Sequence, residues 1–269
     1  IFALQLLSIM ISINYNKAIK FKSGKGQVLA TAIHHGHNVR SDLLKYFAIN
    51  QQERLREEDP YTGDWTNIGD HQLVIEQSRF ECDLNRQRDE AIYKDPSQSW
   101  GLKVYQKDLP FHTHQSIMDY YDYFYTFVKS FLDSQLKKHS HFLVIDLHSY
   151  NHRRKGPKEE PGDIEINPDF NLGTFYIKPY QKWSKVIECF EEEIKSHDFV
   201  VRHNVPFKGG DFSQWINKNW GGKICALTIE VKKIYMDEWT GKIDRATFDK
   251  INNILGSATL KAKSILNEF

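Results

Sequence analysis

The sequence predicts an α/β protein with a mixed, mainly parallel central sheet and helices on both faces. Three apolar runs at 27–33, 142–147 and 224–231 are typical of buried strands. Segments with helical periodicity separate them, and strands that alternate with helices usually pair in parallel between two helical layers. A length of 269 residues fits one large domain, so we interpret 1–269 as a single domain.

The remaining elements are expected in chain order from local patterns. The apolar stretch 1–13 is expected to pack on the core as a terminal strand or helix. A short strand is expected at 72–75, and the charged segment 153–162 is expected to be a surface loop. Four helices are expected: 41–58, with Ser41 as its N-cap and Pro60 just beyond its end, then 116–138, 181–196 and 248–266.

Composition excludes several classes of function. The formal net charge is +1, which gives no overall field for nucleic acid or for an anionic membrane. The first apolar stretch is shorter than a membrane span. The three cysteines, Cys82, Cys189 and Cys225, form no C-x-x-C pair and are too few for a disulfide framework. We therefore expect a cytoplasmic protein that binds neither nucleic acid nor membranes.

Histidines gather where the first apolar strand ends. His34 and His37 form an H-x-x-H pair directly after the run 27–33. Zinc prefers imidazole and carboxylate ligands, and a catalytic site uses about three of them so that one position stays open for water. This pair therefore indicates a zinc site. The alternative is a polar loop with solvated histidines.

The other two predicted strands also carry a polar residue to their carboxyl ends. His148 follows the run 142–147, and Asp146 shares its face because side chains alternate along a strand. Asp146 could orient the imidazole as its hydrogen-bond partner. Glu230 interrupts an apolar strand, where a carboxylate is costly unless it is paired or functional, and it could act as a general base. Ligands bind at this edge of such sheets.

Two further segments could contact an anionic substrate. Arg79 and Arg86 offer planar guanidinium groups that suit a carboxylate or an oxyanion, although salt bridges with Asp83 or other nearby carboxylates explain the pattern equally simply. Lys208 and Gly209 lie in a glycine-rich turn, where backbone amides could approach a ligand.

Six motifs in this order resemble the N-formylglutamate amidohydrolase family, which is related to zinc carboxypeptidases and to aspartoacylase. The motifs are AIHHGH at 32–37, REEDPYT at 56–62, SRFECDLNR at 78–86, IDLHSY at 145–150, PFKGGDF at 206–212 and LTIEV at 227–231. They span about residues 28 to 240, and the resemblance implies the zinc carboxypeptidase-like fold.

The resemblance also implies roles for individual residues. His34 is the first zinc ligand and His148 the last, whereas His37 stands where carboxypeptidases have a glutamate. In formylglutamate hydrolases a Glu-Asp pair follows instead, so the third ligand is His37, Asp59 or Glu58, in this order of preference. Asn85 and Arg86 match an Asn-Arg pair that positions the substrate carboxylate. Glu230 matches the catalytic glutamate.

These roles predict a zinc-dependent hydrolase that cleaves the amide bond of an N-acyl amino acid such as N-formylglutamate. Glu230 would take a proton from water and deliver it to the leaving amine, and Arg86 or Arg79 would stabilise the oxyanion. Two alternatives stay open: a carboxypeptidase-type zinc peptidase that acts on short peptides, and a non-enzymatic metal-binding protein on the same scaffold. The sequence does not fix the oligomeric state.

Overall fold

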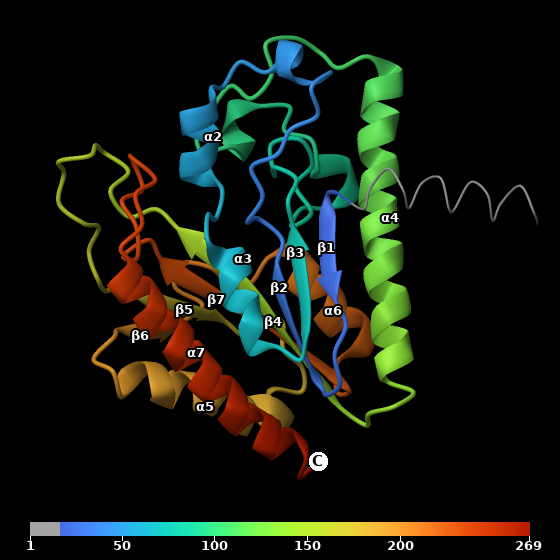
Figure 1. Cartoon of the computed structure of the whole chain (residues 1–269), viewed down its shortest axis with the longest axis vertical. Coiled ribbons are helices and arrows are strands. Elements are labelled where there is room, and N and C mark those ends of the chain that lie inside the picture. Colours follow the sequence, from blue (N-terminus) through green and yellow to red (C-terminus); the bar gives the residue numbers. More distant parts are fainter. Residues whose placement is uncertain (1–16) are drawn as a thin grey trace, which may run out of the picture.

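The computed structural model describes residues 17–269, which form a seven-stranded sheet flanked by helices (Figure 1). The expected element at 1–13 lies outside the described residues. The strands are β1 (Ile19–Lys22), β2 (Val28–Ala32), β3 (His71–Ile75), β4 (Phe142–Tyr150), β5 (Phe170–Gly173), β6 (Val201–His203) and β7 (Ile224–Lys232). The labelled helices are α2 (Gln51–Glu57), α3 (Thr62–Trp65), α4 (Phe111–Gln135), α5 (Tyr180–Lys195), α6 (Asp211–Trp220) and α7 (Arg245–Leu266).

The sheet is mixed and mainly parallel, as the sequence predicts. Its strand order is β1-β3-β2-β4-β7-β5-β6. The central strands β3, β2, β4 and β7 pair in parallel, and β5 pairs in parallel with β6. The antiparallel pairs are β1 with β3 and β5 with β7. The predicted fold class is therefore confirmed.

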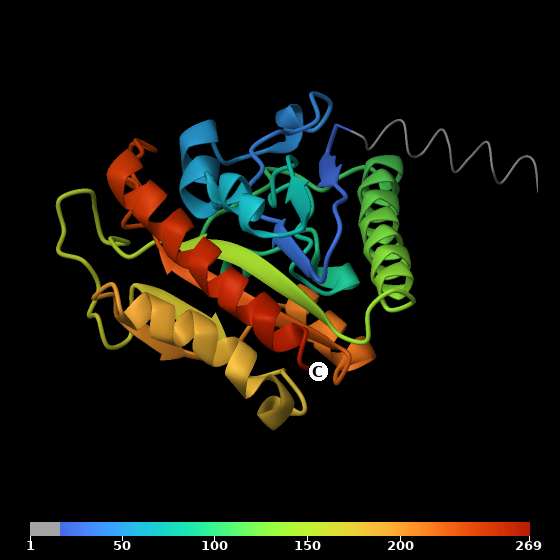
Figure 2. The same ribbon diagram turned by 60° about the horizontal axis from the view of Figure 1, so that its bottom comes forward.

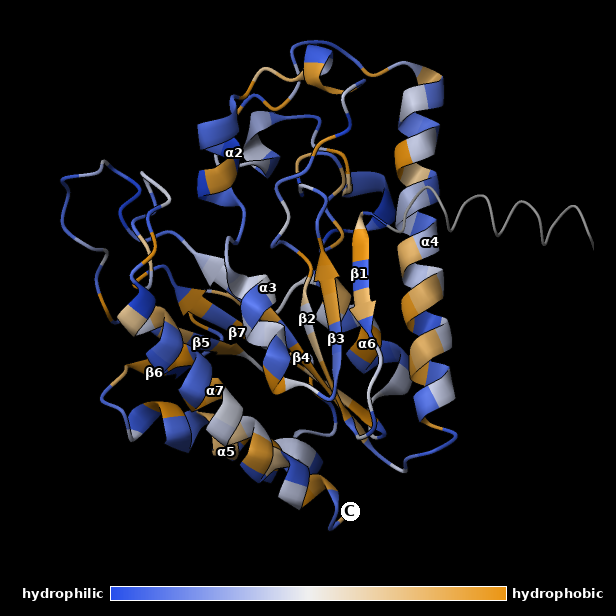
Figure 3. Ribbon diagram, viewed as in Figure 1, coloured by the Kyte–Doolittle hydropathy of each residue, from blue (hydrophilic) through white to orange (hydrophobic). Residues whose placement is uncertain are grey.

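Helices cover both faces of the sheet (Figure 2). On one face α5 and α7 pack over alternate β4 residues such as Leu143 and Ile145. On the other face α4 and α6 pack over Phe142 and Val144. Figure 3 shows apolar residues concentrated on the central strands and interspersed with polar residues along the helices. This two-sided burial explains why β4 and β7 are continuous apolar runs.

One face of the sheet changes from apolar to polar along its central strands. On β4 the residues of the α4 face run from Phe142 and Val144 to Asp146 and His148. On β7 the equivalent residues end in Glu230, and the pairing register places Glu230 opposite His148. The apolar part of this face holds the helices, and its carboxyl end is left for polar side chains.

The segment expected as one helix over 41–58 is mostly irregular. It contains a 3₁₀ helix, Leu44–Tyr46, and the short helix α2. The N-cap of α2 is Asn50, not Ser41, because the Asn50 side chain accepts hydrogen bonds from two backbone N–H groups and Glu53 completes a capping box. Phe47 is extended and forms a bridge with Tyr105, which prevents the longer helix.

Other boundaries shift, and several short elements are not predicted. Strand β4 continues through His148 to Tyr150, since it stays paired with β7 as far as Lys232. The strands β1, β5 and β6 have three or four residues each, too few for a clear pattern. Within residues 17–269, every helix is too short or too polar to cross a membrane.

Candidate metal centre

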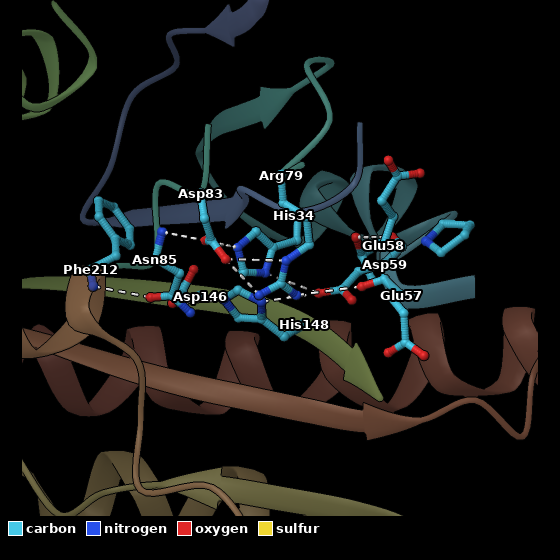
Figure 4. Close-up of polar contacts among 12 residues, drawn as sticks. His34, Glu57, Glu58, Asp59, Arg79, Asp83, Asn85, Asp146, His148 and Phe212 are labelled. Carbon is cyan, nitrogen blue, oxygen red and sulfur yellow. Dashed lines mark hydrogen bonds and ion pairs between the residues drawn. The ribbon is translucent and has the colours of Figure 1, made fainter. Parts of the chain in front are cut away.

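Three buried side chains converge at the carboxyl end of the central strands. His34 lies two residues beyond β2, His148 lies within β4, and Asp59 lies two residues beyond α2. Figure 4 shows the three side chains directed toward one another. The Asp59 Oδ2 atom lies 3.1 Å from His148 Nδ1 and 3.7 Å from His34 Nδ1.

This geometry suits a single metal ion. Among the described residues, these three side chains form a group whose ligand atoms all lie within 4.8 Å of one another. Ligands at about 2.0–2.2 Å from a tetrahedral zinc ion are roughly 3.3 Å apart, so a small adjustment would bring all three onto one ion. Two imidazoles and one carboxylate are also a donor set that catalytic zinc prefers.

The outer nitrogen of each imidazole has a carboxylate partner. His34 Nε2 lies 2.7 Å from Asp83 Oδ1, and His148 Nε2 lies 3.1 Å from Asp146 Oδ2. The Thr31 hydroxyl donates to the other Asp146 oxygen at 2.8 Å. A carboxylate on Nε2 favours the tautomer with its proton there, which leaves the Nδ1 lone pair free for a metal.

Charges in the group are strongly coupled. Burial alone would raise the pKa of Asp59, but hydrogen bonds from His148 and His34 outweigh it and lower this pKa below its usual range. Burial would lower the pKa of His148, but Asp146 and Asp59 raise it well above its usual value. Two carboxylates and two imidazoles held this closely are pre-arranged for a cation.

Asp83 is the centre of a second hydrogen-bond network behind His34. The Arg79 guanidinium lies 2.8 Å from Asp83 Oδ2, and the Tyr93 hydroxyl donates to the same oxygen. Burial would raise the pKa of Asp83, but Arg79 and His34 hold it well below its usual range. Arg79 is therefore engaged in keeping Asp83 ionised and oriented.

Glu230 is buried beside the three candidate ligands. It is 9% exposed, and its pairing with His148 across the sheet places it at the candidate metal centre. Burial, with help from the charges of Asp59 and Asp146, raises the pKa of Glu230 to about 8. This value lies close to neutrality, where a carboxyl group can both accept and release a proton.

The candidate metal centre opens into a cavity of about 500 Å³. The predicted substrate-binding residues Arg79, Asn85, Arg86, Lys208 and Gly209 all line it. Its other lining residues are His34, Glu57, Asp59, Trp100, His148, Ser149, Tyr150, Asn151, Arg154, Tyr176, Pro206, Phe207, Gly210, Asp211, Gln214, Glu230 and Lys233.

Backbone contacts place the substrate-binding candidates around this cavity. The Asn85 side chain accepts the backbone N–H of Phe212 at 3.1 Å, which ties it to the start of α6. A Cβ atom at Gly210 would lie 2.1 Å from the Asn85 amide, so a larger residue there would displace the Asn85 side chain. Arg86 donates to the Gln98 carbonyl at 3.0 Å, and its side chain is 34% exposed. Lys208 is exposed at the edge of the cavity.

His37 and Glu58 lie apart from this group. The His37 Nδ1 atom is hydrogen-bonded to the Glu58 carboxylate, which also accepts a hydrogen bond from the Ser78 hydroxyl. In the described part of the chain, neither residue is among those that line the cavity. The geometry therefore favours Asp59 over His37, contrary to the sequence-based preference, because Asp59 is the side chain that faces both imidazoles.

Several residues of the site are not recognised from the sequence. Trp100 lines the cavity with a positive φ of 54°, which is uncommon for a bulky residue. Its ring lies 4.8 Å from the Arg79 guanidinium and 5.7 Å from that of Arg154. Arg154, expected in a surface loop, pairs with Glu57 at 3.2 Å. The basic run at 153–155 is the sequence feature that marks this segment.

The family of the chain follows from a comparison with known sequences. The N-formylglutamate amidohydrolase family matches residues 26–236. The chain belongs to this family, as its motifs suggest. A search of curated proteins found no match.

Two solved structures support the fold of this chain. The chain is similar to an N-formylglutamate amidohydrolase from Ralstonia eutropha JMP134, with a TM-score of 0.74, 17% identity, and coverage of 93% of this chain and 99% of that one. It is also similar to the gene product Atu2144 from Agrobacterium tumefaciens, with a TM-score of 0.63, 12% identity, and coverage of 90% and 94%. A metallo-carboxypeptidase from Burkholderia cenocepacia gives a TM-score of 0.36 at 13% identity, covering 93% of this chain and 61% of that one.

Proposed function

We propose that this protein is a zinc-dependent amidohydrolase that cleaves the amide bond of an N-formyl or related N-acyl amino acid, such as N-formylglutamate. Membership of the family supports hydrolysis of such an amide. The observation that carries the zinc dependence is the convergence of His34 Nδ1, His148 Nδ1 and Asp59 Oδ2, each imidazole having a carboxylate on its Nε2 atom. We assign these three residues as the metal ligands.

The chemistry divides between the metal and the chain. When bound, zinc supplies a positive charge that makes water more acidic and polarises a carbonyl group. Glu230 accepts the proton of the attacking water and later delivers it to the leaving nitrogen. Burial raises its pKa to about 8 in the absence of a metal, and the positive charge of a bound ion would lower this pKa and favour the carboxylate that accepts the first proton.

Arg86 is the best candidate to bind a substrate carboxylate. Arg79 is nearly buried and its guanidinium is held by Asp83, so it serves first to fix the partner of His34. Arg86 is one-third exposed and lies at 3.9 Å from Asp83, which leaves donors available toward the cavity. Lys208 adds a second positive charge at the edge of the cavity. We therefore infer an anionic substrate.

The cavity would also admit substrates larger than a formyl amino acid. Its volume of about 500 Å³ lies in the range of sites for drug-sized ligands, so short N-acyl peptides belong in the same assay. The free thiols Cys82, Cys189 and Cys225 fit our proposal of a cytoplasmic location.

The test is hydrolysis of N-formylglutamate by the zinc-loaded protein, compared with N-acetylglutamate, N-formylleucine and a dipeptide. We expect the highest kcat/KM for N-formylglutamate and its loss on chelation. Preference for the dipeptide would favour the peptidase alternative. Zinc binding without turnover of any of these amides would contradict the proposed activity.

A further inference from the structure

Lys233 is a buried lysine at the end of the strand that carries Glu230. It follows β7 directly, and its side chain is almost completely buried, with 1% exposed. Its Nζ atom donates to the Arg56 carbonyl at 2.6 Å, to the Glu58 carbonyl at 2.7 Å and to Asn151 Oδ1 at 2.9 Å. An ammonium group has three N–H donors, so all of them are used.

A buried lysine lowers the stability of the fold unless its charge is compensated by partners. Burial of a charged ammonium is unfavourable, and lysines are rarely fully buried. Burial lowers the pKa of Lys233, although the charges of Asp59 and Glu57 oppose this shift. Two of its three acceptors are backbone carbonyls at the carboxyl end of α2, where unpaired carbonyls and the helix dipole favour a positive charge.

The contact with Glu58 fixes the peptide unit that precedes Asp59. The Glu58 carbonyl and the Asp59 N–H belong to one planar peptide group. Lys233 Nζ holds the oxygen of this group, and the His34 carbonyl accepts its N–H at 2.9 Å. On the other side of Asp59, the Tyr235 hydroxyl donates to the Pro60 carbonyl at 2.9 Å. The backbone of Asp59 is therefore held on both sides.

We propose that Lys233 is a positioning residue that holds the backbone of Asp59 so that its carboxylate meets His34 and His148. The proposal rests on the metal-dependent function proposed above. Lys233 lines the cavity, but its donors are all engaged with the chain. It therefore acts through Asp59 and not by contact with the substrate.

The chain offers a matched control next to Lys233. Lys232 is also buried, at 4% exposed, and its Nζ atom contacts Asp169 at 2.7 Å and the Asn167 carbonyl at 3.1 Å, away from Asp59. The variants Lys233→Met and Lys232→Met each remove one buried ammonium and keep most of the side-chain volume. They differ in whether the lost contact holds the Asp59 peptide.

The experiment measures the Kd for zinc of each folded variant by competition with a chelator. Loss of a group that supports a metal ligand typically weakens metal binding about 10–100-fold, so we expect at least a tenfold higher Kd for Lys233→Met. We expect the Kd for zinc of Lys232→Met to change by less than about twofold, because Lys232 does not contact the peptide that holds Asp59. Equal Kd values for Lys233→Met and wild type would overturn the proposal. So would a raised KM for substrate with an unchanged Kd for zinc, since Lys233 would then bind substrate.

A second variant covers the case in which Lys233→Met does not fold. Lys233→Arg keeps a positive charge, but its planar guanidinium cannot reproduce three divergent donors on the same acceptors. We expect a Kd for zinc at least about threefold above wild type, and a wild-type Kd would overturn the proposal. Failure of the wild-type protein to bind zinc is a different result, which overturns the proposed function and this inference with it.

Discussion

The substitution Asp146→Asn tests how strongly a buried carboxylate supports the ligand His148. Asp146 Oδ2 accepts from His148 Nε2 at 3.1 Å, and its other oxygen accepts from the Thr31 hydroxyl. In the variant, the amide oxygen can still face His148, and the amide N–H can face the Thr31 oxygen. The hydrogen bonds are thus kept, and the negative charge is removed.

The expected magnitude follows from this loss of charge. A neutral hydrogen bond contributes about 1 kcal/mol net, and a charge-assisted bond is roughly twice as strong. Asp146 and His148 are both buried, so solvent screens the interaction little. A loss of about 1–1.5 kcal/mol corresponds to roughly a tenfold higher Kd for zinc. The value falls at the low end of the range known for such partners.

The assay is zinc binding by chelator competition at several pH values. Asp146 also helps to raise the pKa of His148 against the effect of burial. The variant should therefore have a lower His148 pKa, and protons should compete less with zinc for this imidazole at acidic pH. The comparison is therefore made at the alkaline limit, where Kd no longer depends on pH. An unchanged Kd there would refute the role given to the Asp146 charge. A wild-type unfolding curve for the metal-free variant excludes a general loss of structure.

Three further predictions concern the proton carrier, the substrate and the fold. Glu230→Gln should lower kcat by at least about a thousandfold with the Kd for zinc nearly unchanged; steady-state kinetics on the zinc-loaded variant measure this, and retained turnover would refute its role. Arg86→Ala should raise KM for N-formylglutamate by at least about tenfold and leave KM for a neutral amide nearly unchanged. The control is Arg88→Ala, which removes an exposed pair with Asp122 and should leave both KM values unchanged. Equal effects of Arg86→Ala on both substrates would argue for a role in the oxyanion site or the fold. Burial lowers the pKa of His71, whose Nδ1 atom accepts the backbone N–H of Gly24 at 3.0 Å, so the neutral form is favoured on folding. The free energy of unfolding should therefore fall as pH drops through about 6.5, the usual pKa of histidine. His71→Asn keeps an acceptor for Gly24, and its free energy of urea unfolding should depend less on pH between about 7 and 5. The same pH dependence in the variant and the wild type would contradict this.

The sequence predicts the central strands and the fold class because burial on both faces makes β2, β4 and β7 apolar runs. The sequence also predicts that His148 and Glu230 lie at the same edge of the sheet, since each stands near the carboxyl end of a parallel strand. The short strands β5 and β6 are not recognisable, because their stability comes from pairing with β7 and with each other. The prediction of a helix over the N-terminal half of 41–58 is wrong for a similar reason, since the bridge between Phe47 and Tyr105 is a tertiary contact that local sequence does not show.

Local spacing cannot decide the third ligand. His37 lies closer in sequence to His34, but the position of Asp59 depends on the hydrogen bond between its N–H and the His34 carbonyl. The contact between Lys233 and the Glu58 carbonyl also joins residues that lie far apart in the sequence. Asp83 stands in a recognisable motif, yet its pairing with His34 depends on how two separate loops meet. The assignment of the site residues therefore stays a prediction.

Zinc content of the purified, reconstituted protein tests the central claim most directly. Elemental analysis is made on wild type, Asp59→Ala and His37→Ala after dialysis against metal-free buffer. We predict about one zinc per chain for wild type and for His37→Ala, and a large loss for Asp59→Ala. The absence of zinc from the wild type, or its loss from His37→Ala with retention in Asp59→Ala, would contradict the proposed metal centre.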